Sequence, residues 1–139
     1  MASIVTYKYI KQNPDIMEYI RRADQALKAQ GYTEHSFAHV EIVAQHASMI
    51  LSELGYDERQ IELARIAGIM HDIGNVINRI DHAQSGAVMA FRLLDNLSMP
   101  ASEICSIISA IGNHDESTAQ PIDCLLYTSP SPRDPKTSR

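Results

Sequence analysis

The sequence has only two cysteines among its 139 residues, Cys105 and Cys124, and they lack the spacing of a metal-binding pair. So few cysteines indicate a reduced, intracellular protein rather than a disulfide-bonded one, and Cys105 is expected to fill the core side of a helix. No apolar run is long enough to span a bilayer, and the first twelve residues lack the apolar centre of a secretory signal. We therefore expect a cytoplasmic protein without a membrane segment.

An excess of basic residues is also missing. The chain has 12 lysines and arginines against 17 aspartates and glutamates, which gives a net charge of −5. This balance provides no strong signal for a nucleic-acid-binding surface. With 139 residues, of which 45% are hydrophobic, the chain is long enough for one globular domain with its own core.

Helical periodicity fills most of the chain, and no long segment alternates with the period of two that is typical of strands. Residues 4–7 alone could form a short strand, but that strand has no obvious partner. Residues 57–70 are apolar around most of the helix circumference, so this segment should be central and should pack antiparallel to the helix before it. The expected fold class is all-α, a compact helical bundle. Caps and apolar spacing predict helices over residues 13–31, 36–54, 57–70, 81–97 and 100–111.

The last fifteen residues break this pattern. From Leu125 to Arg139 the sequence has three prolines, three serines and no helical periodicity, and it looks like translated adapter sequence. Such a composition predicts a disordered segment. We therefore expect a domain over residues 1–124, shortened at its C-terminal end, and a disordered or non-native tail over residues 125–139.

The run from Met70 to Asn75, Met-His-Asp-Ile-Gly-Asn, closes the apolar helix and puts His71 and Asp72 at a buried helix end. Burying this pair costs several kcal/mol unless partners satisfy it. Imidazole and carboxylate form a good ligand pair for a divalent metal, and a carboxylate can bridge two cations. The pair therefore predicts a metal site, with a helix-cap hydrogen bond as the alternative. Gly74 is expected to act as a helix stop, needed for its backbone geometry rather than for a contact.

Other histidines lie on the helices around this pair. Each of them has a structural alternative, as a core residue or as a surface residue at a helix end. His46 is interpreted as structural rather than as a ligand. The remaining candidates for the metal site and its surroundings are His35, His39, His82 and His114.

Taken in order, His39, His71-Asp72, His82 and His114 resemble the HD superfamily of metal-dependent phosphohydrolases, in its HDIG form. The segment Asp81–Ala87 resembles that family's histidine followed by a Gly-Ala pair, and Ile111–Glu116 resembles its later histidine segment. The resemblance covers about residues 31–123. It implies an HD-domain fold and hydrolysis of a phosphate ester or anhydride through a metal-activated water.

The resemblance also implies a set of site residues. Asp72, His82 and His114 would be catalytic, and they would act on a phosphorylated small molecule or a nucleotide. Arg79 could bind a substrate phosphate through its planar guanidinium or could be a solvated loop residue, and His35 could contact phosphate or cap a helix. The cofactor would be one or two divalent ions of manganese, iron, cobalt, nickel, zinc or magnesium. By the resemblance, the primary ion would be held by His39, His71 and Asp72. His82 and His114 would hold a second ion or form the phosphate pocket.

One departure from the family pattern leaves the function open. The family supplies a last aspartate ligand from a later helix, and neither Asp123 nor Asp134 lies in a periodic helix that could replace it. An inactive chain is therefore one alternative, and a non-catalytic module that binds a nucleotide or regulates a partner is another. A third alternative is a di-iron oxygenase with the same ligands. The missing helix would also leave an apolar face exposed, which favours homo-oligomers.

Overall fold

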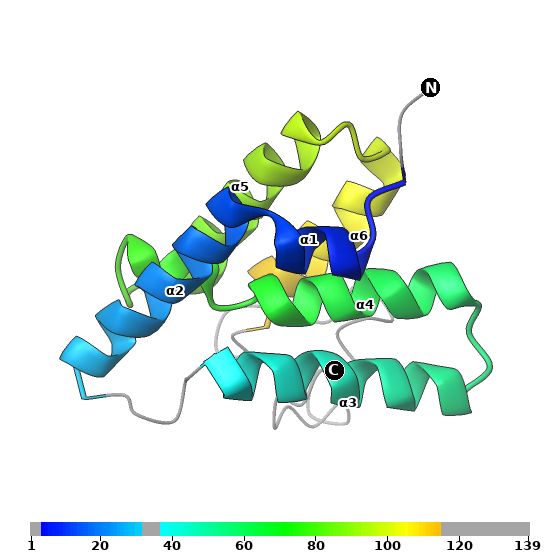
Figure 1. Cartoon of the computed structure of the whole chain (residues 1–139), viewed down its shortest axis with the longest axis horizontal. Coiled ribbons are helices and arrows are strands. Elements are labelled where there is room, and N and C mark those ends of the chain that lie inside the picture. The colour runs from blue at the N-terminus through cyan, green and yellow to red at the C-terminus, as the bar shows by residue number, and fades with distance from the viewer. Residues whose placement is uncertain (1–3, 32–36, 115–139) are drawn as a thin grey trace, which may run out of the picture.

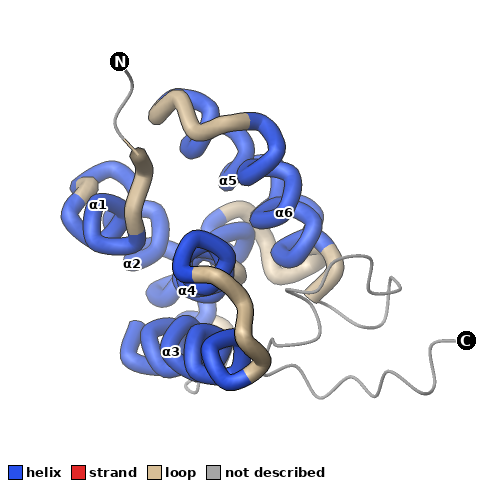
Figure 2. Tube along the Cα trace, turned by 90° about the vertical axis from the view of Figure 1, so that its right-hand side faces the viewer, coloured by secondary structure: helices blue, strands red, loops and turns tan. Residues whose placement is uncertain are grey.

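The computed structural model describes residues 4–31 and 37–114, which form helices and no strand (Figure 1, Figure 2). The expected all-α class is confirmed for this part of the chain. None of its helices is long and apolar enough to cross a membrane. The predicted tail and its boundary at residue 124 lie outside the described residues. In chain order the elements are α1 (Tyr7–Gln12), α2 (Pro14–Ala29), α3 (Phe37–Glu53), α4 (Glu58–Met70), the 3₁₀ turn η1 (Ile73–Val76), α5 (His82–Asn96) and α6 (Ala101–Gly112).

Local capping signals set several of these boundaries, as the sequence predicts. The side chain of Asn13 accepts hydrogen bonds from the first backbone N–H groups of α2, each at 3.0 Å. Asp57 caps α4 in the same way, with 2.8 Å between its Oδ1 and the N–H of Gln60. Gly31 and Gly55 follow α2 and α3 with φ of +92° and +87°, a conformation that glycine adopts without strain.

Residues 4–7 do not form the strand that the sequence left open: Thr6 caps α1, and its Oγ1 accepts the N–H of Tyr9 at 3.0 Å. One local expectation is wrong. Cys105 does not fill the core, because it is exposed on α6. The apolar stripe of α6 runs through Ile104, Ile107 and Ile111, all buried, and Cys105 lies about 100° around the helix from Ile104.

Helix α4 lies at the centre of the bundle, as its apolar circumference predicts. It packs against α1, α3 and α6, and Figure 2 shows it between α3 and the other helices. Figure 1 shows α3 and α4 side by side and antiparallel, joined by the turn after Glu53. The two helices approach closely because Gly68 has no side chain: a Cβ there would lie 2.7 Å from the Cα of Ala44. This contact fixes the C-terminal part of α4 against α3.

Arg59 ties α4 to α6 and to the N-terminal segment. Its Nε and Nη2 donate to the two carboxylate oxygens of Glu103 at 2.9 and 2.6 Å. Its Nη1 donates to Glu62 at 2.9 Å and to the carbonyl of Val5 at 2.8 Å. The hydrogen bonds from Arg59, only partly opposed by burial, lower the pKa of Glu103.

The variant Glu103→Gln is expected to be about 1 kcal/mol less stable than the wild type at neutral pH, and to lose less stability in acid. Because the pKa of Glu103 is lower in the folded state, its contribution is present above the unfolded value of about 4.5 and is lost as the pH falls through the folded pKa. Urea unfolding between neutral and acid pH measures both effects. Glu53→Gln, at an exposed position on α3, is the control. If the free energy of unfolding fell equally in acid for Glu103→Gln and for the wild type, the stabilising role of the Glu103 carboxylate would be contradicted.

Candidate metal centre

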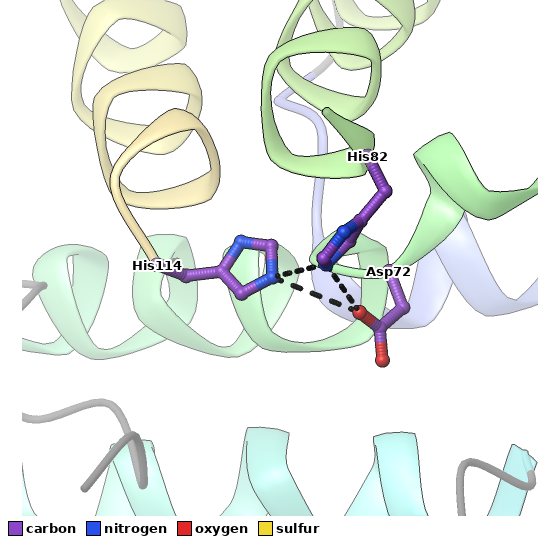
Figure 3. Close-up of side chains that lie close together, drawn as sticks. All are labelled: Asp72, His82 and His114. Carbon is purple, nitrogen blue, oxygen red and sulfur yellow. Dashed lines mark hydrogen bonds and ion pairs between the residues drawn. The ribbon is translucent and has the colours of Figure 1, made fainter. Parts of the chain in front are cut away.

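Four of the predicted ligands converge where helices end. His71 is the C-cap of α4, Asp72 directly precedes η1, His82 begins α5, and His114 follows the C-cap of α6. Figure 3 shows the side chains of Asp72, His82 and His114 pointing toward one another from these three places. Asp72 and His82 are buried, with 6% and 7% of their surfaces exposed. The site is therefore built from the ends of α4, α5 and α6.

Close packing of η1 on α5 brings Asp72 and His82 together, and Gly74 makes it possible. A Cβ on Gly74 would lie 2.0 Å from the carbonyl oxygen of His82 and 2.5 Å from the backbone nitrogen of Gly86. Its φ is not in the left-handed region, where the structure has only Gly31 and Gly55 among the described glycines. The expectation that Gly74 is needed for backbone geometry rather than for a contact is therefore wrong. Its lack of a side chain is what the contact requires.

The Asp72 carboxylate presents its two oxygens to different imidazoles. Its Oδ2 lies 3.2 Å from Nε2 of His71, while its Oδ1 lies 3.5 Å from Nε2 of His82 and 3.7 Å from Nε2 of His114. One ligand atom from each of Asp72, His82 and His114 lies within 4.8 Å of the others. That spacing allows the three residues to hold a common ion.

The three histidines share one hydrogen-bond pattern, which determines where their lone pairs point. In each case Nδ1 contacts the backbone carbonyl oxygen three residues earlier. A carbonyl can only accept, so Nδ1 carries the proton, and Nε2 of the neutral ring presents a lone pair. The Nδ1-to-oxygen distances are 2.6 Å for His71 to Gly68, 3.1 Å for His82 to Arg79 and 2.6 Å for His114 to Ile111.

The rings of His82 and His114 therefore meet through two lone pairs. Their Nε2 atoms are 3.1 Å apart, and the rings pack edge to face with 4.9 Å between centroids. Two acceptors at that distance repel each other unless a cation or a proton lies between them. Asp72 adds carboxylate oxygen to the same place. Nitrogen and oxygen donors so arranged suit a divalent metal, so the residues present fit such an ion.

Charge and burial favour the metal-binding forms of Asp72 and His82. Burial alone would raise the pKa of Asp72, but the charge and hydrogen bonds that His71 and His114 supply when they are protonated outweigh it and hold the pKa well below its usual range. Burial, with His114 nearby, lowers the pKa of His82. Burial also lowers the pKa of His71, but it is outweighed by the charge of Asp72, by the hydrogen bond between His71 and Asp72, and by the hydrogen bond from His71 to the carbonyl of Gly68, which together raise the pKa. An ionised carboxylate and a neutral imidazole are the forms that bind metal.

The sequence also predicted site roles for His35, His39 and Arg79. His35 lies outside the described residues, as do Asp123 and Asp134. His39 lies in α3, but its side chain is outside what the structure describes. Arg79 is half-buried beside the site, where its carbonyl oxygen accepts from His82. His46 is exposed on α3 and is not part of the cluster.

Sequence reasoning assigned no role to Asn75, although it ends the motif run. This residue is 1% exposed, and its side-chain amide donates to the carbonyl oxygen of Asp72 at 2.8 Å. The signal in the sequence is an asparagine inside an otherwise apolar turn, because a buried amide needs specific partners. No local pattern tells which partners these are.

Comparison with known proteins gives two matches. A family model described as HD domain matches residues 36–135. The fold is similar to the crystal structure of a predicted HD superfamily hydrolase from an uncultured Thermotogales bacterium, with 28% sequence identity and a TM-score of 0.58. The alignment covers 81% of this chain and 64% of the other, so this chain spans less than two thirds of that protein's length. No curated protein matches the sequence.

Proposed function

This chain belongs to the HD domain family, and from that premise we propose that it is a metal-dependent phosphohydrolase acting on a phosphate ester or anhydride. The similar structure of a predicted HD superfamily hydrolase supports hydrolase chemistry. The observation that carries the proposal is the pair of facing lone pairs on His82 and His114, 3.1 Å apart beside the Asp72 carboxylate. A divalent metal is the cation that this donor set suits.

The two carboxylate oxygens of Asp72 would allow two ions. His82 and His114 would hold one ion with Oδ1, on the side where their Nε2 atoms already face it. His71 would hold a second ion with Oδ2, and the position of His39 in α3 makes it the candidate for a further ligand there. Mixed nitrogen and oxygen ligation suits manganese, iron, cobalt, nickel or zinc, and magnesium suits a more open site.

A divalent ion bound there supplies a water of lowered pKa and positive charge beside the phosphoryl oxygens. The chain's own part is to fix the ligands before substrate arrives. Backbone carbonyls orient the three imidazole rings, and burial keeps bulk water away from Asp72. Arg79 would bind a phosphate oxygen through its guanidinium, which lies next to the site at Asn75. The substrate would be a phosphorylated small molecule or a nucleotide.

Purified protein loaded with manganese, iron, cobalt, nickel, zinc or magnesium is expected to hydrolyse an aryl phosphomonoester, an aryl phosphodiester or nucleotides, with release of the aryl alcohol from the first two and of phosphate from nucleotides. A chelator should abolish the release, and His82→Ala should lower it by about 100-fold or more, since even indirect partners of a metal contribute 10–100-fold. His46→Ala, at an exposed position away from the cluster, should retain the wild-type rate. Metal content per chain, measured on the same samples, links rate to occupancy.

Two other results would overturn the proposal. Metal binding with nucleotide binding but no hydrolysis of any of these substrates, across all six metals, would make the chain a binding module. Oxygen consumption that depends on substrate and on iron, again without hydrolysis of these substrates, would make it an oxygenase. Both measurements use the same loaded protein, so the three functions are separated in one series.

A further inference from the structure

Asn75 stabilises the turn that carries Asp72 through two hydrogen bonds. Its side-chain Nδ2 donates to the carbonyl oxygen of Asp72 at 2.8 Å, and its own backbone N–H donates to the same oxygen at 3.0 Å. The residue is 1% exposed, so water does not compete with these bonds. The carbonyl of Asp72 is therefore held from two directions by one residue.

The other end of the same amide reaches Arg79. The Oδ1 of Asn75 accepts from Nη1 of Arg79 at 3.4 Å. Only one orientation of the amide satisfies both neighbours, because a carbonyl oxygen needs a donor and a guanidinium needs an acceptor. The orientation of Asn75 is therefore determined by its partners.

Arg79 continues this chain of contacts to a second candidate ligand. Its carbonyl oxygen accepts from Nδ1 of His82 at 3.1 Å and from the backbone N–H of His82 at 3.3 Å. The Nε2 of His82 then faces Oδ1 of Asp72 at 3.5 Å, which closes a ring of four residues. In this ring Asp72 and His82 are candidate metal ligands. The other two members, Asn75 and Arg79, are not.

We propose that Asn75 is a positioning residue that holds Asp72 directly and His82, through Arg79, in the arrangement that binds the metal. This inference rests on the proposed function in one respect, that the arrangement binds a divalent metal. The carbonyl of Arg79 sets the tautomer of His82, and Asn75 keeps the Arg79 segment in place. Removing such an indirect partner typically weakens metal binding by 10–100-fold.

Asn75→Leu tests the inference with little change in volume. The carbonyl of Asp72 keeps the backbone N–H of residue 75, and Arg79 is half-buried, so the metal-free fold should tolerate the change. We expect the dissociation constant for Zn²⁺, measured by competition with a chromogenic chelator, to rise by about 10–100-fold. Asn113→Leu is the matched control, because its amide also donates to a backbone carbonyl, that of Ser109 at 2.9 Å, next to His114. Equal Zn²⁺ affinity for Asn75→Leu and wild type would overturn the inference.

A second readout needs no metal. Nitrogen NMR of the imidazoles in the metal-free protein should show His82 protonated at Nδ1 in the wild type and a mixture of tautomers in Asn75→Leu. Asn75→Asp keeps an acceptor for Arg79 and loses the donor to Asp72, so it should retain the tautomer while losing part of the Zn²⁺ affinity. Asn75→Ala replaces Asn75→Leu if that variant does not fold. An unchanged tautomer in the folded variant would overturn the inference. A wild type that binds no metal would instead contradict the proposed function.

Discussion

Replacing Asp72 with asparagine is expected to weaken divalent-metal binding by about 100-fold or more without lowering the stability of the metal-free protein. The amide has nearly the same shape as the carboxylate but loses the negative charge that a cation needs. It gains two N–H donors beside the Nε2 lone pairs of His82 and His114, which lie 3.5 and 3.7 Å from Oδ1. Chelator competition measures the affinity, and thermal unfolding without metal measures the stability.

The same variant separates a metal centre from a structural ion pair. If Asp72 served only to pair with a protonated His71, its replacement would leave a buried charge without its partner, at a cost of about 3–5 kcal/mol. A large loss of stability with unchanged metal affinity would therefore refute the metal site. His46→Ala is the control for affinity, because this exposed histidine on α3 is not part of the cluster.

Helix boundaries were predictable from the sequence because their causes are local. Asn13 and Asp57 satisfy N–H groups two or three residues away, and Gly31 and Gly55 relieve strain at their own positions. The sequence left the structure of residues 4–7 open because their partners are distant. The N–H of Tyr7 donates to Glu62 at 2.9 Å, and the carbonyl of Val5 accepts from Arg59. Partners more than fifty residues away in the sequence leave no local pattern.

The candidate site was predictable to a similar extent. Its residue types could be read from the order of the histidines and from the His71-Asp72 pair, and the structure brings His71, Asp72, His82 and His114 together. What the sequence could not predict is the direction of each lone pair. That direction depends on a backbone carbonyl one helical turn before each ring, and any residue type provides a carbonyl. The role of Asn75 depends on the same backbone geometry.

Gly74→Ala is expected to destabilise the protein by about 3 kcal/mol, which corresponds to a melting temperature lower by roughly 10 °C. Its Cβ would lie 2.0 Å from the carbonyl oxygen of His82 and 2.5 Å from the backbone nitrogen of Gly86. Both neighbours are backbone atoms, so no side-chain rotation can relieve the clash, and η1 must move away from α5. That movement separates Asp72 from His82, so metal affinity should fall together with stability.

Gly112→Ala provides the contrast, because a Cβ at Gly112 has its nearest neighbour, the Cβ of Ala87, at 3.4 Å, an ordinary contact. Removing a glycine at a position with negative φ in α6 should leave stability unchanged or raise it by up to about 1 kcal/mol. Thermal unfolding and Zn²⁺ competition on the two variants compare two single-methyl additions to glycines near the same site. If Gly74→Ala matched Gly112→Ala in both measurements, the close contact of η1 with α5 would not be what brings Asp72 to His82. If Gly74→Ala alone lost both properties, the packing of η1 on α5 would be established as a requirement for the site.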